Sequence, residues 1–203
     1  MPDFIPGIDL ARLFYEDHVS SIVDEVPHAA ALLGEGSEVL GFDTERSTDH
    51  AWGPRLQLFV EEDAAPELSA RLDEGLAQDV RGWPVRFFRW QEDAVTHHVE
   101  VWTLEEWLGK TLGYDPRNGM PSERWLALPQ QTLLHVTAGA VFHDETGELT
   151  KVRELLAWYP KDIWLWIMMS GWQRVQDTEP MVGRTAEVGD EIGNRLVIAR
   201  LIG

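Results

Sequence analysis

The stretch LLGEGSEVLGFDTERSTDHAWGPRLQLFV, residues 32–60, decides how the first part of this chain folds. An apolar segment, HAAALL, runs directly into a turn that contains Gly34, Gly36 and Ser37, and an apolar run, PRLQLFV, ends the stretch. Short apolar runs bounded by Gly, Pro or polar clusters are typical of buried strands. The stretch therefore predicts two strands joined by a polar loop, whose Gly-Ser pair and Asp-His-Ala triplet are candidate parts of an active site.

Segments around this stretch complete a mixed α/β first half. Two segments have apolar residues at every third or fourth position, as helices do, and two others are short, apolar and partly alternating, as strands are; their ranges are given at the end of this paragraph. Thr103 and Glu106 form a capping-box sequence that marks a switch from strand to helix. Because one βα unit is followed by successive strands, a mixed sheet is favoured over a doubly wound parallel sheet. The predicted elements are helices over residues 7–26 and 65–80 and strands over residues 83–90 and 97–103.

The pattern from about residue 104 onward is helical, so we expect an α/β domain over residues 1–103 and a helical domain over residues 104–203. Pro160 is suited to the start of a helix. The tryptophans of this half are expected to pack in the core or between helices. The helices are predicted over residues 148–159, 161–176 and 187–202, and the tryptophans are Trp107, Trp125, Trp158, Trp164, Trp166 and Trp172.

Composition excludes several classes of function. With 17 basic and 35 acidic residues among 203, the formal net charge is −18, which would repel a phosphate backbone; a nucleic-acid partner is therefore not expected. The same acidity could simply favour solubility. The chain has no cysteine, no apolar run long enough for a membrane span and no signal-peptide pattern, so a cytoplasmic protein without disulfides or cysteine-ligated metal is expected.

Three short motifs have the residue types that nucleotidyl transfer to a hydroxyl requires. That reaction needs a loop to hold phosphate oxygens and carboxylates to hold divalent metal. Gly36 and Ser37 offer the loop, and Asp49 offers a carboxylate ahead of the second strand. Glu100 lies between two valines in a predicted strand, so it points away from the core if the valines pack inside. Each motif is weak alone, because an exposed Glu on an edge strand gives the same string.

The order and spacing of these motifs resemble the signature of the polymerase-β-like nucleotidyltransferase superfamily. From about residue 34 to the C-terminus, the chain also resembles an uncharacterised bacterial family of nucleotidyltransferase-like domains, itself of unknown function. The resemblance implies a nucleotidyltransferase-like mixed sheet with flanking helices, followed by a helical region shorter at its C-terminus than in the relatives. The similar segments are GFDTERSTDHAWGPRLQLF, VEVWT, LLHVTAGAVFHD, GELTKVRELLAWYPKDIWL and VGRTAEVGDEIGNRLVIARL.

The resemblance implies an enzyme that transfers a nucleoside monophosphate from an NTP, with ATP the expected donor, to a hydroxyl of a small molecule or protein. Asp49 and Glu100 would hold two Mg²⁺ ions together with the residue at position 51, and Gly36 and Ser37 would hold phosphates. Further candidates are Arg46, Lys151 and Arg184 for the nucleotide and Asp190 as the base that activates the acceptor.

Each of these further candidates also has an ordinary structural interpretation. Arg46 could be a solvent-exposed loop residue, and Lys151 could lie on a solvated helix face. Near Asp190, Glu191 and Arg195 are spaced as a pair that could simply stabilise a helix.

The chain departs from the family pattern at the centre of the expected site. The pattern reads Asp-His-Asp-Trp-Gly, whereas residues 49–53 read Asp-His-Ala-Trp-Gly. Ala51 supplies no ligand oxygen, so two-metal catalysis should be crippled. Either the natural protein is a non-catalytic relative or the alanine was introduced. The alternative function is therefore a nucleotide-binding or partner-binding regulatory module, for example antitoxin-like, and a purely structural domain with an empty cleft is a third.

Overall fold

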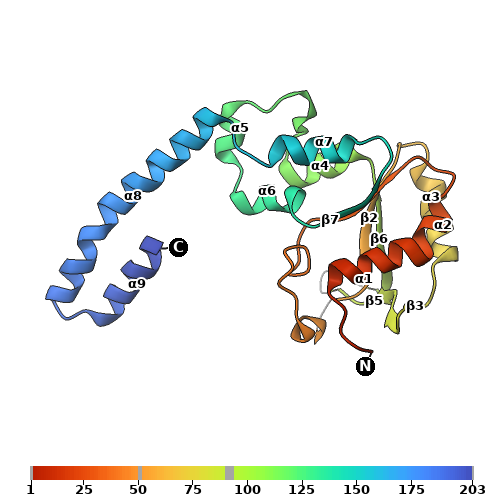
Figure 1. Ribbon diagram of the computed structural model, residues 1–203, viewed down its shortest axis with the longest axis horizontal. Coiled ribbons are helices and arrows are strands. Elements are labelled where there is room, and N and C mark those ends of the chain that lie inside the picture. The colour runs from red at the N-terminus through yellow and green to blue at the C-terminus, as the bar shows by residue number, and fades with distance from the viewer. Residues whose placement is uncertain (1, 50–51, 90–93, 203) are drawn as a thin grey trace. The chain divides into compact units, whose positions relative to one another are not determined.

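The computed structural model describes residues 2–49, 52–89 and 94–202. Its contacts divide the chain into two compact units, Met1–Trp158 and Tyr159–Gly203 (Figure 1). The sequence placed the boundary near residue 103 instead. The difference arises because a strand at Ala140–Asp144 returns to the sheet of the first unit and keeps the helices before it in that unit.

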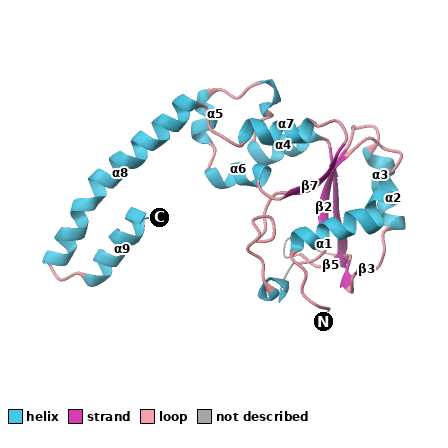
Figure 2. Ribbon diagram, viewed as in Figure 1, coloured by secondary structure: helices cyan, strands magenta, loops and turns pink. Residues whose placement is uncertain are grey.

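The first unit is built on a five-stranded mixed sheet in the order β5-β6-β2-β1-β7. Figure 2 shows the strands in magenta with helices beside them. Strands β2 and β6 are parallel, and the remaining neighbours are antiparallel. This arrangement confirms the predicted mixed α+β class, with flanking helices and a helical C-terminal region. The strands are β1 (Ala29–Leu32), β2 (Arg55–Phe59), β5 (Arg86–Phe87), β6 (Thr96–Trp102) and β7 (Ala140–Asp144); β3 (Asp79–Val80) and β4 (Trp83–Pro84) form a separate two-stranded sheet.

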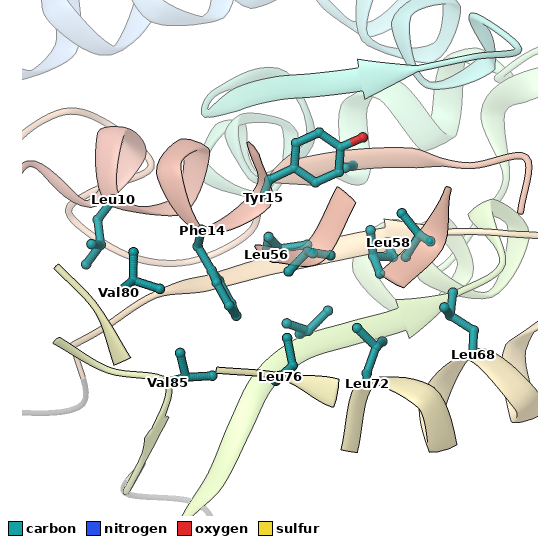
Figure 3. Packing of buried hydrophobic residues seen from close by; sticks show 14 of the residues in the cluster. Leu10, Phe14, Tyr15, Leu56, Leu58, Leu68, Leu72, Leu76, Val80 and Val85 are labelled. Carbon is teal, nitrogen blue, oxygen red and sulfur yellow. The ribbon is translucent and has the colours of Figure 1, made fainter. Parts of the chain in front are cut away.

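The main hydrophobic core lies between one face of the sheet and the helices before and after β2 (Figure 3). Leu56 and Leu58 point to this face from β2, and Phe14 and Leu72 meet them from the helices. The predicted helix over residues 7–26 ends at Val23 and contains a π-helical segment, and the predicted helix over residues 65–80 ends at Gly75. The helices are α1 (Gly7–Phe14), the π-helical η1 (Tyr15–Val19), α2 (Ser20–Val23) and α3 (Ala65–Gly75).

The rest of the first unit begins with α4, whose start the capping box predicts correctly. The Glu106 amide donates to Thr103 Oγ1 at 3.2 Å, and the Thr103 amide donates to Glu106 Oε2 at 3.3 Å. Strand β7 interrupts a region that the sequence predicted to be entirely helical. The sequence did not reveal this strand, because its five half-buried residues are too few to show a clear period. The elements are α4 (Leu104–Leu112), the 3₁₀ turn η3 (Pro116–Asn118), α5 (Ser122–Ala127), α6 (Gln130–Thr137) and α7 (Glu148–Leu156).

The second unit consists of α8 (Lys161–Glu187) and α9 (Glu191–Ile202). Pro160 occupies the N-cap of α8, but this helix runs well beyond the predicted end at residue 176. The expectation that the tryptophans are mostly core residues is wrong for four of them: Trp107 and Trp125 are buried, whereas Trp158, Trp164, Trp166 and Trp172 are exposed. No helix in the described part of the chain combines the length and the apolar character needed to cross a membrane.

Candidate functional site

Glu100 points away from the main core. In the parallel ladder Val99 pairs with Leu56 and Glu100 pairs with Gln57, so successive residues alternate between the two faces. Val99 is buried in the core, whereas the Glu100 side chain is 37% exposed. The Trp102 Nε1 donates to Glu100 Oε2 at 3.1 Å, and Arg89 Nη1 lies 3.8 Å from Glu100 Oε1. A carboxylate is thus held on the second face of the sheet with access to solvent.

The loop that carries Gly36 and Ser37 is tied to the start of β2. Arg55 Nε donates to Glu38 Oε1 at 2.9 Å, and Arg55 Nη2 donates to the Glu35 carbonyl. Within the loop, the amides of Leu40 and Phe42 donate to the Ser37 carbonyl at 3.2 and 2.9 Å. The Arg55 guanidinium is therefore used inside the protein. Gly36 has a φ of 130°, in the region that favours glycine.

The loop continues to the 3₁₀ turn η2 (Glu45–Asp49), which precedes β2. Asp49 and Arg46 are both exposed at this turn. His50 and Ala51 lie outside the described residues, so the expected position of the missing carboxylate is not described. The structure therefore places Asp49 before β2 and Glu100 on the strand beside β2.

The remaining predicted residues belong to other elements of the chain. Lys151 is exposed on α7 of the first unit, and Arg184 is exposed on α8 of the second. The Asp190 carboxylate accepts a hydrogen bond from the Gly193 amide at 2.9 Å at the start of α9, which is a capping contact. In the same helix, Arg195 Nη2 lies 3.7 Å from Glu191 Oε2. This is the ion pair, four residues apart, that the sequence suggested as a stabilising contact of the helix. The contacts described at Asp190 are thus those of a helix cap.

A cavity of about 400 Å³ lies at the other end of β2, near the carboxyl ends of β2 and β6. Sequence reasoning missed it, because its lining comes from turns and helix starts far apart in the chain. One cation among the lining residues, Arg117, lies 3.2 Å from Glu148 and 2.7 Å from Asp115. The acidic lining is unsuited to a polyphosphate, because like charges repel. The acidic lining residues are Glu61, Glu62, Glu105, Glu106, Asp144 and Glu148.

A second group that the sequence did not reveal is formed by His28, His143 and Glu145. In the described part of the chain, these residues form the one group of three or more potential metal ligands whose donor atoms all lie within 4.8 Å of one another. His28 and His143 are far apart in sequence and have no ligand-like spacing. A prediction that residues 29–32 and 140–144 form paired strands would have brought these residues together.

Comparison with known proteins relates part of the chain to a family. A family model described as "Domain of unknown function (DUF4037)" matches residues 125–203, from α5 to the end of α9. The matched segment contains Lys151, Arg184 and Asp190 but not Asp49 or Glu100. No curated protein and no solved structure matched the chain. The similarity found is therefore to a family of unknown function, over the C-terminal segment, and the polymerase-β-like superfamily stays a prediction.

Proposed function

We propose that the second face of the sheet, at the start of β2, binds an NTP with Mg²⁺ in the manner of a nucleotidyltransferase, and that Ala51 removes most of the transfer activity. The observation that carries this proposal is the orientation of Glu100. Its carboxylate is on the face opposite the core, on the strand that pairs in parallel with β2. Asp49 ends the turn that leads into β2.

The available side chains fit one Mg²⁺ ion better than two. Mg²⁺ prefers oxygen ligands and is commonly held by one or two carboxylates together with substrate phosphates. Asp49 and Glu100 are exposed or half-exposed carboxylates and offer such oxygens. Bound Mg²⁺ would neutralise charge on the phosphates and on departing pyrophosphate. A bridging carboxylate at position 51 is what a second ion would need, and alanine lacks it.

The loop residues would bind and orient the triphosphate. Turns with exposed backbone N–H groups form concave sites for anions. The Arg55–Glu38 pair fixes this loop against β2. The acceptor hydroxyl would attack the α-phosphorus and lose its proton to solvent, forming a P–O bond as the bond to pyrophosphate breaks. The acidic surface favours a small-molecule or protein acceptor over nucleic acid.

A regulatory module that binds NTP or a protein partner without turnover is the second candidate function. Ala51 favours it, since the chain as written lacks the carboxylate that catalysis requires. Where the regulatory module binds NTP, the two candidates predict the same nucleotide binding and differ in what an aspartate at position 51 does.

The test compares the chain with its Ala51→Asp variant. Pyrophosphate release from ATP and Mg²⁺ is measured for both with mixed small-molecule hydroxyl acceptors and with the protein itself as acceptor. The Ala51→Asp variant is expected to release pyrophosphate at least tenfold faster, and Ala51→Asn, of similar size, is the matched control. Nucleotide binding without any gain of activity would support the regulatory module.

Binding itself is measured by thermal shift with ATP and Mg²⁺, because a ligand that binds only the native state raises its apparent stability. We expect a rise for the chain as written and its loss in Glu100→Gln. Glutamine keeps an acceptor for Trp102 but removes the charge, so the unliganded melting temperature should change little. Absence of both nucleotide binding and restored turnover would overturn the proposal.

A further inference from the structure

The pairing of β1 with β7 brings two histidines and a glutamate together. Ala30 pairs with His143, and the Glu145 amide donates to the His28 carbonyl at 3.2 Å. Directly opposite residues of an antiparallel pair share a face, as do residues two apart on one strand. The side chains of His28, His143 and Glu145 therefore share one face of this ladder. The rings of His28 and His143 have centroids 4.5 Å apart.

His28 is held in the tautomer that a metal ligand needs. Its Nδ1 lies 2.7 Å from the Val26 carbonyl, which can only accept, so Nδ1 carries the proton. The lone pair is then on Nε2, which lies 2.9 Å from the Tyr15 hydroxyl. Histidines that bind metal usually donate their other N–H to a carbonyl or carboxylate in this way. Burial lowers the pKa of His28, which keeps the ring neutral near pH 7.

The surroundings of the two rings favour a cation. Glu145 and Asp24 both interact electrostatically with His28 in the direction that favours positive charge at its ring, whereas His143 acts in the opposite direction. Tyr15 lies at the first position of the π-helical segment η1, a departure from the regular helix that is frequent at functional sites. The donor set of two imidazoles and one carboxylate matches a common zinc coordination shell with an open fourth position.

We propose that His28, His143 and Glu145 form a binding site for a divalent transition metal of the Zn²⁺ type. His28 Nε2 is one ligand, and the Tyr15 hydroxyl that now contacts it is released when the ion enters. A small inward rotation of the side chains reaches the usual ligand distances of about 2.0–2.2 Å. The site links the start of β1 to the end of β7, so an ion there stabilises the fold.

This site is separate from the proposed nucleotide site. His28 precedes β1, whereas the loop with Gly36 and Ser37 follows β1, so the two sites lie at opposite ends of that strand. The inference does not rest on the proposed function. Mg²⁺ is also a poor substitute here, because it prefers an all-oxygen shell.

The experiment is a calorimetric titration of the metal-stripped full chain with Zn²⁺, followed by Co²⁺ absorption to report the ligand geometry. One equivalent is expected to bind, with the visible bands of a four-coordinate Co²⁺ ion and a higher melting temperature. His143→Ala and Glu145→Gln should each weaken Zn²⁺ binding at least tenfold. Glu145 is exposed, so its variant tests the site even if His143→Ala fails to fold.

Two controls separate this site from weak binding to the acidic surface. His135→Ala removes an imidazole from α6, and Glu148→Gln removes a carboxylate from α7; neither should change the affinity. Tyr15→Phe should tighten binding several-fold, because the hydroxyl no longer competes for His28 Nε2. Zn²⁺ binding that is absent, or that is as strong in His143→Ala and Glu145→Gln as in the unsubstituted chain, would overturn the proposal.

Discussion

Arg55, the first residue of β2, forms a largely buried ion pair with Glu38 in the loop that follows β1. Arg55 Nη2 lies 2.8 Å from Glu38 Oε1, and the two side chains are 7% and 13% exposed. The same guanidinium donates to the Glu35 carbonyl. One arginine thus holds both ends of the Gly36–Ser37 turn against the strand on which the candidate site depends.

Arg55→Ala is expected to lower the free energy of unfolding by about 3 kcal/mol, because it leaves the Glu38 carboxylate buried without its partner. Urea denaturation measures the loss. Arg81→Ala is the control, since it breaks an exposed pair with Asp17 at 2.9 Å and should lose less than about 1 kcal/mol. Equal losses in the two variants would contradict the role given to Arg55.

Gly139→Ala is expected to be severely destabilising. Gly139 precedes β7 with a φ of 75°, and a Cβ there would lie 2.0 Å from the Leu32 carbonyl oxygen. Strand β1 and the chain before β7 would have to separate, so a loss of more than about 3 kcal/mol is expected. Gly147→Ala, at a φ of 69° with nothing near the added atom, should lose only about 1 kcal/mol. Chemical denaturation measures the free energy of unfolding of both variants. Gly139→Ala reports steric conflict together with backbone strain, and Gly147→Ala reports backbone strain alone.

Thr103→Ala is expected to lower the free energy of unfolding by about 1 kcal/mol, because it removes the side-chain oxygen that accepts from the Glu106 amide at the start of α4. Thr103→Ser keeps that oxygen and should retain most of the stability. Thermal or urea unfolding distinguishes the two. A serine variant as unstable as the alanine variant would show that the methyl group, and not the cap, is what matters.

The pKa of His28 predicts a pH dependence of stability. Burial lowers this pKa below 6.5 in the folded state, with the neighbouring His143 acting in the same direction. Below about pH 6.5 the unfolded chain therefore binds more protons at this residue, so stability present above that pH is lost as the pH falls. The slope from one group is at most about 1.4 kcal/mol per pH unit.

This dependence is measured by urea denaturation at pH 7.5 and 5.5, with chelator present to remove metal. His28→Gln should lose less stability over this interval than the unsubstituted chain, and His135→Gln should lose as much. If His28→Gln and the unsubstituted chain have the same pH slope, the assignment to His28 fails.

Local patterns in the sequence predicted β1, β2, β6, α3 and α7, whereas the single strand predicted over residues 83–90 is two short strands, β4 and β5, that belong to different sheets. The capping box at Thr103 and the alternation of Val99, Glu100 and Val101 depend on neighbours only a few residues apart, and the structure confirms both. The π-helical segment η1 was not visible, because its hydrophobic pattern matches that of an ordinary helix. The end of α3 at Gly75 was missed because Leu76 and Val80 continue the helical spacing while packing into the core.

For the candidate site, the sequence supplied the residue types and their order. Asp49 and Glu100 were identified from local strings, and the orientation of Glu100 follows from strand alternation. The sequence did not predict that Arg55 is committed to Glu38 or that Asp190 caps α9, since each depends on which partner the folded chain brings near.

By itself the sequence determined the mixed class of the fold, the start of α4 and the absence of a carboxylate at position 51. The tertiary structure alone decided that β7 joins β1, and with that pairing it brought His28, His143 and Glu145 to one face. The reason is physical: helices and caps form between residues close in sequence, whereas the pairing of β1 with β7 joins residues more than a hundred positions apart. Local periodicity carries no information about such a partner.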